Sequence, residues 1–336
     1  MTEYQLNKAC LTMTGKCNFN CEYCYLDKDF KELSTSQWLE FIDVLSNYEN
    51  IKYIQLTGGE PFVRKDFLKI LEKCSSIFQS IVVMTNGSLI GEKESNKLSE
   101  FNNVKLFVSL DTVDCTLFDN IVGQKGACKR VLNAIKLLQK KNVPLIIQSA
   151  SSNVEQFKRL PQLKEYIKKN KLNWRKYGGL VLTENETVED LDLISKLYVK
   201  KHIKDLKKNQ KNVKKISYMP FCGAGFTSFG VLENGDITPC LVTRDSRYIA
   251  GNILVDNFMD IADSSPIFKD WREKFCVTDE ECKTCKFSDK CLYGCPLRRD
   301  RLSKVLNIEL SKDIENCALY SYIEKISSDK ELSLYS

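Results

Sequence analysis

Three cysteines stand close together near the start of the chain, at Cys17, Cys21 and Cys24. Thiolate sulfur binds zinc and iron–sulfur clusters, and both kinds of centre normally take four protein ligands. A set of three leaves one metal position open. An open iron accepts nitrogen and oxygen donors, such as the amino and carboxylate groups of an α-amino acid. The spacing C-x3-C-x2-C therefore indicates a metal site that binds a second molecule, with a zinc knuckle as the alternative.

A second group of seven cysteines lies toward the C-terminus. Its members are Cys222, Cys240, Cys282, Cys285, Cys291, Cys295 and Cys317. Their spacing alone allows a double zinc ribbon or two four-iron clusters. Because two such clusters normally need eight ligands, either one iron is open or another residue binds it. Cys276 is a candidate for that ligand by its proximity in the sequence.

Composition narrows the classes of function. The only histidine, His202, argues against histidine-rich zinc catalysis and against a Ser-His-Asp triad. The N-terminus lacks a secretory signal and no apolar run could span a bilayer, so we expect a cytoplasmic protein without membrane contact. Fifteen cysteines in a reducing compartment favour metal binding over a disulfide framework. The net charge of +6 is weak support for nucleic-acid binding, because bound cluster thiolates would offset it.

Alternating strands and helices must position the first three cysteines. Strand patterns occur at 8–14, 52–59, 80–87, 104–111, 143–150 and 172–182, and helix patterns at 34–49, 66–78, 92–101, 127–141, 153–169 and 187–208. Such units build a parallel sheet whose strand ends carry the chemistry. We expect an α/β fold with a partial (β/α)6 TIM-like barrel over 1–207, followed by a mostly irregular cysteine-rich domain over 208–336. Ser34 and Gln37 predict a capping box, and Pro161 predicts a kink or break.

Two stretches resemble one enzyme family. CNFNCEYCY at 17–25 resembles the signature of radical S-adenosylmethionine (SAM) enzymes, and LTGGEPFV at 56–63 resembles their SAM-binding GGEP stretch. The resemblance implies that the first three cysteines hold a [4Fe–4S] cluster whose open iron is chelated by SAM. It further implies that one-electron reduction cleaves SAM to a 5′-deoxyadenosyl radical, which removes a hydrogen atom from an unactivated carbon.

The resemblance also implies a set of SAM contacts at the strand ends. We expect Gly58 and Gly59 to let the backbone approach the methionine end of SAM. Glu60 or nearby carbonyl groups are candidates for binding its ammonium group. The predicted SAM-binding residues are Tyr23, Gly58, Gly59, Glu60, Pro61, Asn86, Ser109 and Asp111. The alternative for each of them is an ordinary turn or capping role.

The C-terminal cysteines resemble the SPASM extension of radical SAM enzymes, in their order and in a CxAG…G-x4-C opening. The resemblance implies that Cys222, Cys240 and Cys295 bind one auxiliary cluster. It assigns the remaining members, Cys282, Cys285, Cys291 and Cys317, to a second one. Spacing alone does not give this partition. With the SAM cluster, we expect three [4Fe–4S] clusters in total. An auxiliary cluster could accept a second electron from the substrate radical.

Three functions remain open at this point. The resemblance favours hydrogen abstraction from a peptide, leading to oxidative modification or crosslinking in ribosomal peptide maturation. The alternatives are a radical dehydrogenase or epimerase of a sugar or alcohol, and a metal-binding interaction module. The barrel begins near residue 8, so we expect no leader-binding domain. Either a separate partner presents the peptide or the substrate needs no leader.

Two further expectations concern electrons and hydrogen atoms. We expect a flavodoxin or ferredoxin to reduce the SAM cluster. Cys115 follows Asp111 in a strand-end loop, where a thiol could donate a hydrogen atom to a product radical. A structural role for this cysteine is the alternative.

Overall fold

The computed structural model describes residues 5–26, 31–150, 154–176, 204, 214–217, 222–288, 293–312, 314 and 317. The chain divides into two compact units. The first comprises Met1–Ser149, Ile167–Arg175 and Ala224–Trp271, and the second comprises Ala150–Tyr166, Lys176–Gly223 and Arg272–Ser336. Residues 224–271, expected in the second domain, thus lie in the first compact unit.

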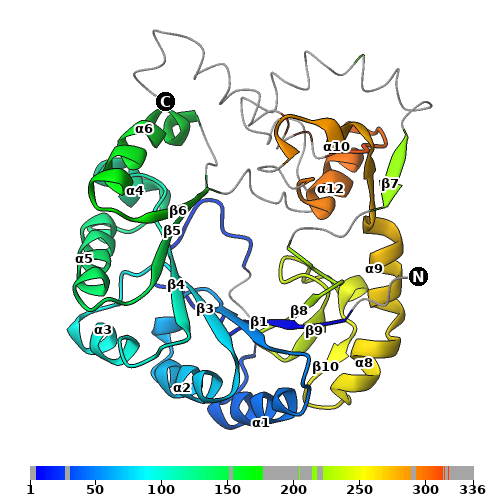
Figure 1. Cartoon of the computed structure of the whole chain (residues 1–336), viewed down its shortest axis with the longest axis horizontal. Coiled ribbons are helices and arrows are strands. Elements are labelled where there is room, and N and C mark those ends of the chain that lie inside the picture. The colour runs from blue at the N-terminus through cyan, green and yellow to red at the C-terminus, as the bar shows by residue number, and fades with distance from the viewer. Residues whose placement is uncertain are drawn as a thin grey trace. The chain divides into compact units, whose positions relative to one another are not determined.

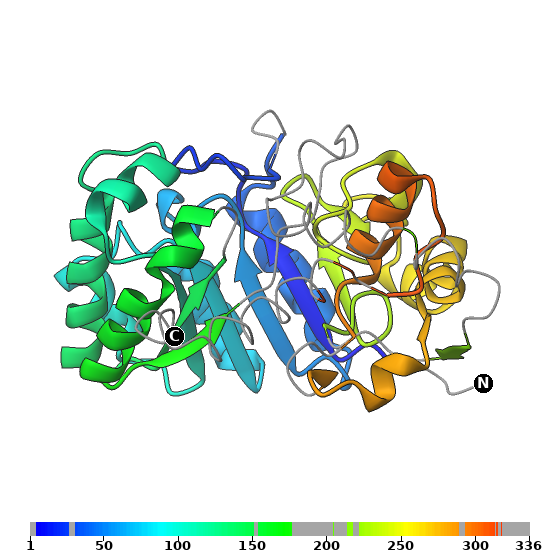
Figure 2. The ribbon, with the colours of Figure 1, turned by 90° about the horizontal axis from the view of Figure 1, so that it is seen from above.

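A nine-stranded sheet forms the centre of the first unit, in the order β10-β9-β8-β1-β2-β3-β4-β5-β6. Its strands are β1 (Lys8–Thr12), β2 (Tyr53–Thr57), β3 (Ser80–Thr85), β4 (Val104–Ser109), β5 (Leu145–Ser149), β6 (Asn173–Lys176), β8 (Ser228–Val231), β9 (Asp236–Thr238) and β10 (Gly251–Asn252). Strands β1 to β5 pair in parallel, so their carboxyl ends lie along one edge of the sheet. Figure 2 shows the dark-blue strand β1 near the middle of this row.

Five helices of the first unit connect the parallel strands. They are α1 (Thr35–Ser46), α2 (Phe67–Ile77), α3 (Glu92–Leu98), α4 (Cys115–Ile121) and α5 (Ala127–Lys140). Figure 1 shows α1, α2, α3 and α5 along the outer side of the curved sheet. Helices α1, α2 and α3 each connect one strand to the next, and α4 and α5 together connect β4 to β5. Such helical connections are what parallel pairing requires.

Helix α1 shows why the sequence folds this way locally. Ser34 accepts a hydrogen bond from the N–H of Gln37 at 3.3 Å, and the Gln37 side chain accepts one from the N–H of Ser34 at 2.8 Å. This capping box confirms the prediction. The apolar face is buried against the sheet through Trp38, Phe41, Ile42 and Leu45, all at most 4% exposed.

Strands β8, β9 and β10 continue the sheet beyond β1. Strand β8 pairs in parallel with β1 and antiparallel with β9. The 3₁₀ turn η3 (Ser246–Tyr248) lies between β9 and β10, and the helices α8 (Phe258–Ser264) and α9 (Pro266–Phe275) follow β10. The ring of Phe258 lies 6.0 Å from that of Phe41 and 4.7 Å from that of Phe229, so α8 packs on both α1 and β8.

The described part of the second unit holds few regular elements. Strands β7 (Lys215–Ser217) and β11 (Val277–Asp279) pair antiparallel, and α10 (Glu281–Thr284) and α12 (Pro296–Leu306) follow them in the chain. A small core of Leu302, Ile308, Leu310 and Ile314 packs at the end of α12. The expectation that the region 208–336 is mostly irregular stays a prediction, because helices and strands cover much of its described part.

The α/β fold and its parallel sheet confirm the predicted class, with two local differences. Helix α6 (Val154–Lys169) continues through Pro161, so the predicted break is wrong and the alternative, a kink, stays a prediction. Helix α4 was not predicted. Most of the predicted helix at 187–208, with His202, lies outside the described residues.

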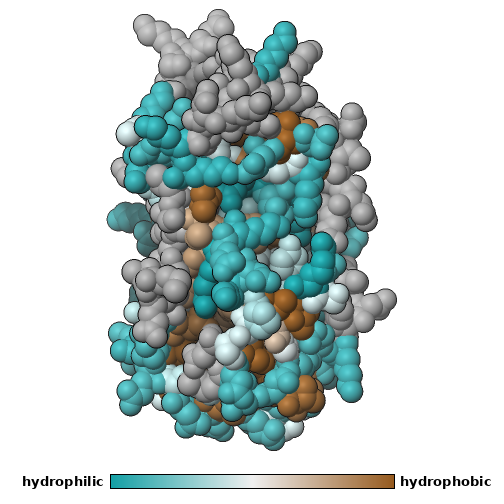
Figure 3. Space-filling model, turned by 90° about the vertical axis from the view of Figure 1, so that its right-hand side faces the viewer, coloured by the Kyte–Doolittle hydropathy of each residue, from teal (hydrophilic) through white to brown (hydrophobic). Residues whose placement is uncertain are grey.

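No helix among the described residues combines the length and the apolar character needed to cross a membrane. On the face in Figure 3, brown hydrophobic residues form several separate patches between teal hydrophilic ones.

Candidate functional site

The three N-terminal cysteines lie in one loop directly after β1. The N–H of Cys24 donates to the carbonyl of Cys21 at 3.2 Å, which closes a tight turn. Burial raises the pKa of Cys21 to about 12, and the neighbouring charges of Cys17 and Cys24 raise it further. The three thiols are therefore close enough to oppose one another's ionisation. Positive metal charge would remove that cost, because metal-bound cysteines bind as thiolates.

Two donors approach the sulfur of Cys17. The N–H of Phe19 lies 3.3 Å from Sγ, and the amide nitrogen Nδ2 of Asn86 lies 3.9 Å from it. Donors of this kind stabilise the thiolate form, as a cluster ligand requires. Within the described residues no three Cys, His, Asp or Glu side chains converge as ligands of a single metal ion. Three thiols in one loop are the donor type that a four-iron cluster takes, with one thiolate on each of three irons.

The cysteine loop rests on the C-terminal end of α4. The N–H groups of Asn20 and Glu22 donate to the carbonyls of Val122 and Ile121, at 2.9 and 3.1 Å. The ring of Phe19 packs edge-on against that of Phe118, which is 1% exposed. Helix α4 thus supplies both polar and apolar support to the residues between the cysteines.

The GGEP stretch packs directly on the backbone that leads into Cys17. The N–H of Gly59 donates to the carbonyl of Thr14, and the N–H of Glu60 donates to that of Lys16, both at 2.8 Å. A Cβ atom on Gly58 would lie 2.6 Å from the Thr14 oxygen, and one on Gly59 would lie 2.2 Å from the Lys16 oxygen. In this structure the two glycines are needed for close contact between two protein segments. The predicted approach to SAM stays a prediction.

The Glu60 side chain points into the protein and is fully buried. Its carboxylate accepts hydrogen bonds from the Thr85 hydroxyl at 2.8 Å, the Asn86 N–H at 2.6 Å and the Phe62 N–H at 3.1 Å. Burial raises the pKa of Glu60 to about 7, although these hydrogen bonds oppose the rise. The carboxylate therefore braces the ends of β2 and β3 from inside. This geometry gives no support to a direct contact with the SAM ammonium group.

Asn86 ties the end of β3 to the cysteine loop. Its Nδ2 donates to the Oδ1 of Asn18 at 3.0 Å, and its Oδ1 accepts from the hydroxyl and N–H of Ser88 at 2.7 and 2.8 Å. Asn18 in turn donates to the Ser88 hydroxyl at 2.8 Å. This closed triangle of side chains fixes the amide that faces Cys17.

Tyr23 makes the matching link to the end of β4. Its hydroxyl donates to Oδ2 of Asp111 at 2.6 Å, and Asp111 is 2% exposed. Burial, followed by the negative charge of Asp111, raises the pKa of Tyr23 well above its usual range. Ser109 ends β4 opposite Gln148, and Pro61, which is buried, opens the turn η1 (Pro61–Val63). The predicted SAM-binding residues thus gather at the carboxyl ends of β2, β3 and β4 and in the cysteine loop.

Sequence reasoning missed two residues that hold the start of this loop. Arg64 donates to the carbonyls of Met13 and Leu33 at 2.9 and 3.0 Å and pairs with Asp66 at 2.6 Å. The Glu32 carboxylate accepts from the Thr14 hydroxyl at 2.6 Å and from the Gly15 N–H at 3.1 Å. Burial alone would raise the pKa of Glu32, but these bonds and Lys16 lower it. Neither residue belongs to a periodic pattern, so only their position beside the two motifs could have indicated them.

The second cysteine set is placed in part. Burial raises the pKa of Cys282, which also lies within range of the charges of Cys285 and Lys312. Lys312 is in turn influenced by Cys317. Three of the four cysteines predicted for the second auxiliary cluster thus share one neighbourhood, and Cys291 lies outside the described residues.

The other predicted auxiliary ligands are divided between the compact units. Cys240 follows β9 in the first unit, while Cys222 and Cys295 belong to the second. Cys295 precedes α12, where its carbonyl accepts from the N–H of Arg299 at 3.0 Å. The sulfur of Cys276, the candidate extra ligand, lies 3.8 Å from the carbonyl oxygen of Glu273. Their assignment to a cluster stays a prediction.

Cys115 differs from its expected form. Its sulfur is bonded to that of Cys128, so in this structure it carries no S–H hydrogen to donate. The suggested role as a hydrogen donor is therefore corrected. One disulfide among the described residues is not a disulfide framework, so the expectation of metal binding for the other cysteines stays a prediction.

Comparisons with known proteins agree with this geometry. The sequence model of the Radical SAM superfamily matches residues 11–153, and that of the SPASM iron–sulfur cluster-binding domain matches residues 222–286. The first match contains the cysteine loop and the ends of β2, β3 and β4.

Two curated relatives match along most of the chain. The antilisterial bacteriocin subtilosin biosynthesis protein AlbA of Bacillus subtilis (strain 168) is 28% identical over 86% of this chain and 67% of its own length. The mycofactocin maturase MftC of Mycolicibacterium smegmatis is 25% identical over 85% of this chain and 77% of its own.

A solved structure shows the same fold. Streptococcus suis SuiB bound to precursor peptide SuiA superimposes with a TM-score of 0.66 at 17% identity, over 93% of this chain and 76% of that one. Together, the two domain matches and the arrangement of the cysteine loop lead to one assignment. The chain belongs to the radical SAM superfamily and carries a SPASM iron–sulfur cluster-binding domain.

Proposed function

We propose that this protein is a radical SAM enzyme that removes a hydrogen atom from a peptide and so starts an oxidative modification or crosslink in ribosomal peptide maturation. The observation that carries the proposal is the crowded triad of Cys17, Cys21 and Cys24 at the carboxyl ends of parallel strands, with hydrogen-bond donors aimed at Cys17. The relatives AlbA and MftC, by their names, belong to bacteriocin biosynthesis and mycofactocin maturation. SuiB has been solved with a precursor peptide.

In this proposal the three thiols of the cysteine loop hold a [4Fe–4S] cluster with one open iron. Bound there, the cluster and SAM supply one-electron cleavage of a carbon–sulfur bond. The chain's own residues do the positioning. Asn86 and the Phe19 N–H stabilise the Cys17 thiolate. Glu60 holds the ends of β2 and β3 together. Tyr23, next to Cys24, ties the cysteine loop to Asp111 at the end of β4.

The same proposal places two auxiliary clusters in the SPASM domain, which makes three [4Fe–4S] clusters in all. Their ligands would be Cys222, Cys240 and Cys295 for one, and Cys282, Cys285, Cys291 and Cys317 for the other. The shared neighbourhood of Cys282, Cys285 and Cys317 supports the second set. These clusters would take the electron that a two-electron oxidation of the peptide releases.

Three circumstances of the reaction belong to the proposal as well. A flavodoxin or ferredoxin would reduce the SAM cluster, and a separate leader-binding protein would present the peptide unless no leader is needed. A cytoplasmic location would provide the reducing conditions that thiolate ligands need.

The first experiment tests SAM cleavage. The anaerobically reconstituted protein, given dithionite and SAM, should form 5′-deoxyadenosine, which liquid chromatography measures. The variant with Cys17, Cys21 and Cys24 all changed to Ala should form none. Cys10→Ala, which changes a thiol on β1 outside the predicted ligand sets, is the control and should keep the activity. Persistent cleavage in the triple variant would exclude the proposed cluster site.

The second experiment tests the substrate class. Short precursor peptides encoded beside this protein should lose hydrogen mass on incubation with the enzyme, SAM and reductant, and tandem mass spectrometry locates the change. Unchanged peptides, together with SAM-dependent oxidation of a sugar or alcohol, would replace the peptide assignment with small-molecule dehydrogenation.

A further inference from the structure

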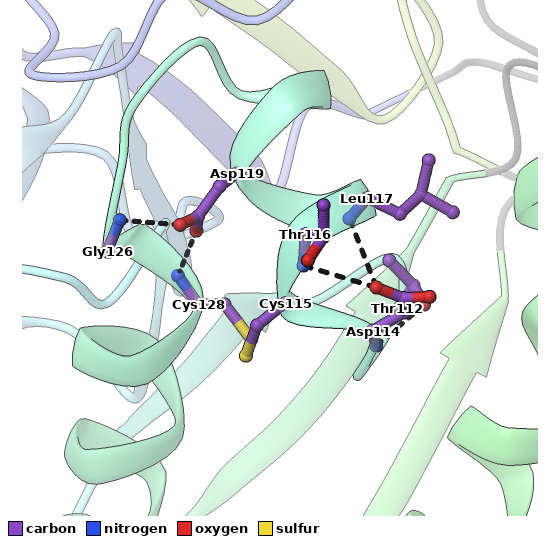
Figure 4. Close-up of a disulfide and its surroundings, with 8 residues drawn as sticks. All are labelled: Thr112, Asp114, Cys115, Thr116, Leu117, Asp119, Gly126 and Cys128. Atoms are coloured by element: carbon purple, nitrogen blue, oxygen red, sulfur yellow. Dashed lines mark hydrogen bonds between the residues drawn. A yellow bond between two sulfur atoms is a disulfide. The ribbon is translucent and has the colours of Figure 1, made fainter.

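A disulfide between Cys115 and Cys128 joins the first residue of α4 to the first turn of α5, with 5.1 Å between their Cα atoms. Figure 4 shows the sulfur–sulfur bond bridging the two helices. We propose that this pair is a reversible thiol-exchange site, opened by a dithiol reductant, whose oxidation state sets the rigidity of the α4 support beneath the cysteine loop. The inference concerns redox modification of the fold and goes beyond the proposed reaction on SAM and peptide.

The two sulfurs differ in exposure, which gives the exchange a direction. Cys115 is partly exposed, whereas Cys128 is fully buried. A reductant thiolate can therefore attack the sulfur of Cys115, forming a mixed disulfide and releasing Cys128, which takes up a proton. The reductant's second thiol then attacks its own mixed-disulfide sulfur and releases Cys115. Two thiols form in the protein while the reductant becomes an intramolecular disulfide, so two electrons and two protons are transferred.

Local contacts preserve both helix starts when the bond opens. The Asp114 carboxylate caps α4 by accepting from the N–H groups of Thr116 and Leu117, at 3.1 and 3.2 Å. The Asp119 carboxylate accepts from the N–H groups of Gly126 and Cys128, at 2.5 and 2.9 Å. Figure 4 shows these contacts on either side of the disulfide. Reduction therefore removes one link between two intact helices, which allows the bond to form again.

The link matters because of what the other end of α4 holds. The helix has only seven residues, and its last turn offers the carbonyls of Ile121 and Val122 to Glu22 and Asn20 of the cysteine loop. Phe118, on the same helix, packs against Phe19. Because α4 is only about two turns long, loss of the anchor at its first residue should also increase the mobility of its last residue. The oxidised pair is expected to hold the loop more tightly than the reduced pair.

The first test measures the bond itself. Trypsin cleaves after Lys105, Lys125 and Lys129, so Cys115 falls in the fragment 106–125 and Cys128 in the fragment 126–129. Only the disulfide joins these two fragments. Holoenzyme equilibrated anaerobically in graded ratios of reduced and oxidised dithiothreitol, then blocked with N-ethylmaleimide, should show the joined fragments falling and both blocked fragments rising together. Two blocked thiols at every ratio, or a joined pair at every ratio, would overturn the proposal.

The second test measures the effect on the loop. Hydrogen–deuterium exchange of the peptide that contains Asn20 and Glu22 should become several-fold faster in Cys115→Ser holoenzyme. Cys10→Ala is the matched control and should exchange like the wild type. Reduced wild type provides the same comparison without a substitution. Equal exchange in oxidised wild type, reduced wild type and Cys115→Ser would refute the coupling between the disulfide and the loop.

Discussion

Glu60 is the residue at which burial and hydrogen bonding compete most directly. A carboxylate without solvent contact is costly, yet three donors converge on it from Phe62, Thr85 and Asn86. The result is a pKa raised from 4.5 to about 7. The group therefore changes charge near neutral pH, at a point where it holds two strand ends in place.

This raised pKa predicts a pH-dependent stability. Between about pH 4.5 and pH 7 the folded state binds more protons at Glu60 than the unfolded state does, so its contribution to stability falls as pH rises and then stays constant above that range. In Glu60→Gln this dependence should be absent. Urea unfolding of both proteins at pH 5 and pH 8 measures this dependence. Relative to Glu60→Gln, the wild type should have a lower free energy of unfolding at pH 8 than at pH 5. An identical difference at the two pH values would show that Glu60 stays charged throughout.

The sequence was informative about residues with special chemistry and uninformative about those that support them. The cysteines, GGEP and Asn86 occur in recognisable stretches, so their places at the strand ends could be anticipated. Glu32 and Arg64 act by holding the backbone of Thr14 and Met13. Such contacts depend on which segments meet in space, and no local pattern records that. For the same reason, the packing of Gly59 against Lys16 could not be read from the sequence.

At the level of elements, the tight contact between GGEP and the strand-to-loop segment predicts a severe effect of one methyl group. In Gly59→Ala the new Cβ would meet backbone atoms of Lys16 at 2.2 and 2.6 Å, so the segment before Cys17 must move. We expect a loss of about 1–3 kcal/mol in stability, together with reduced iron content. Chemical denaturation and iron analysis measure these two quantities.

Gly91→Ala is the control for this substitution. Gly91 precedes α3, and a Cβ there would meet only the flexible Glu94 carboxylate, at 3.3 Å. It should therefore retain wild-type iron content. If Gly59→Ala also retained it, the backbone contact would not be needed to shape the cysteine loop.

Helix α4 illustrates the limit of periodicity in recognising elements. It has seven residues, of which only Phe118 and Ile121 are buried, so the sequence contains no repeated apolar pattern that would predict this helix. Longer helices such as α1 and α5 present a full apolar face and were predicted within a few residues. The sequence does not indicate the disulfide at the start of α4 either. With fifteen cysteines in the chain, metal binding is the favoured role and no pair stands out as a disulfide.

The disulfide predicts a measurable contribution to stability. Cys115 and Cys128 are 13 residues apart, and closing a loop of that length restricts the unfolded chain by about 3 kcal/mol. The double variant Cys115→Ala, Cys128→Ala should unfold at lower urea concentration than the oxidised wild type. Wild type kept in dithiothreitol should resemble the double variant. Were the reductant to leave the wild-type unfolding curve unchanged, the bond would contribute nothing to the folded state.

At the scale of the whole molecule, the parallel sheet was predictable because each strand is followed by a helix with its own apolar face. The pairing of β8 with β1 was not, since it joins residues more than two hundred positions apart. That pairing brings residues 224–271 into the first compact unit. The segment that follows the predicted barrel therefore shares a sheet with the strands that lead into the cysteine loop, and it carries Cys240.

The predicted ligand sets yield the last prediction, on cluster number. Three four-iron clusters amount to about 12 irons and as many sulfides per chain. Changing Cys222, Cys240 and Cys295 to Ala should remove one cluster and leave about 8 irons, while 5′-deoxyadenosine formation persists at the separate N-terminal site. Peptide oxidation should fall because the second electron loses an acceptor. Iron and sulfide analysis, together with Mössbauer spectroscopy, measures the loss. An unchanged count of about 12 would mean that those three cysteines hold no cluster. A count of about 4 would mean that the SPASM domain keeps its second cluster only when the first is in place.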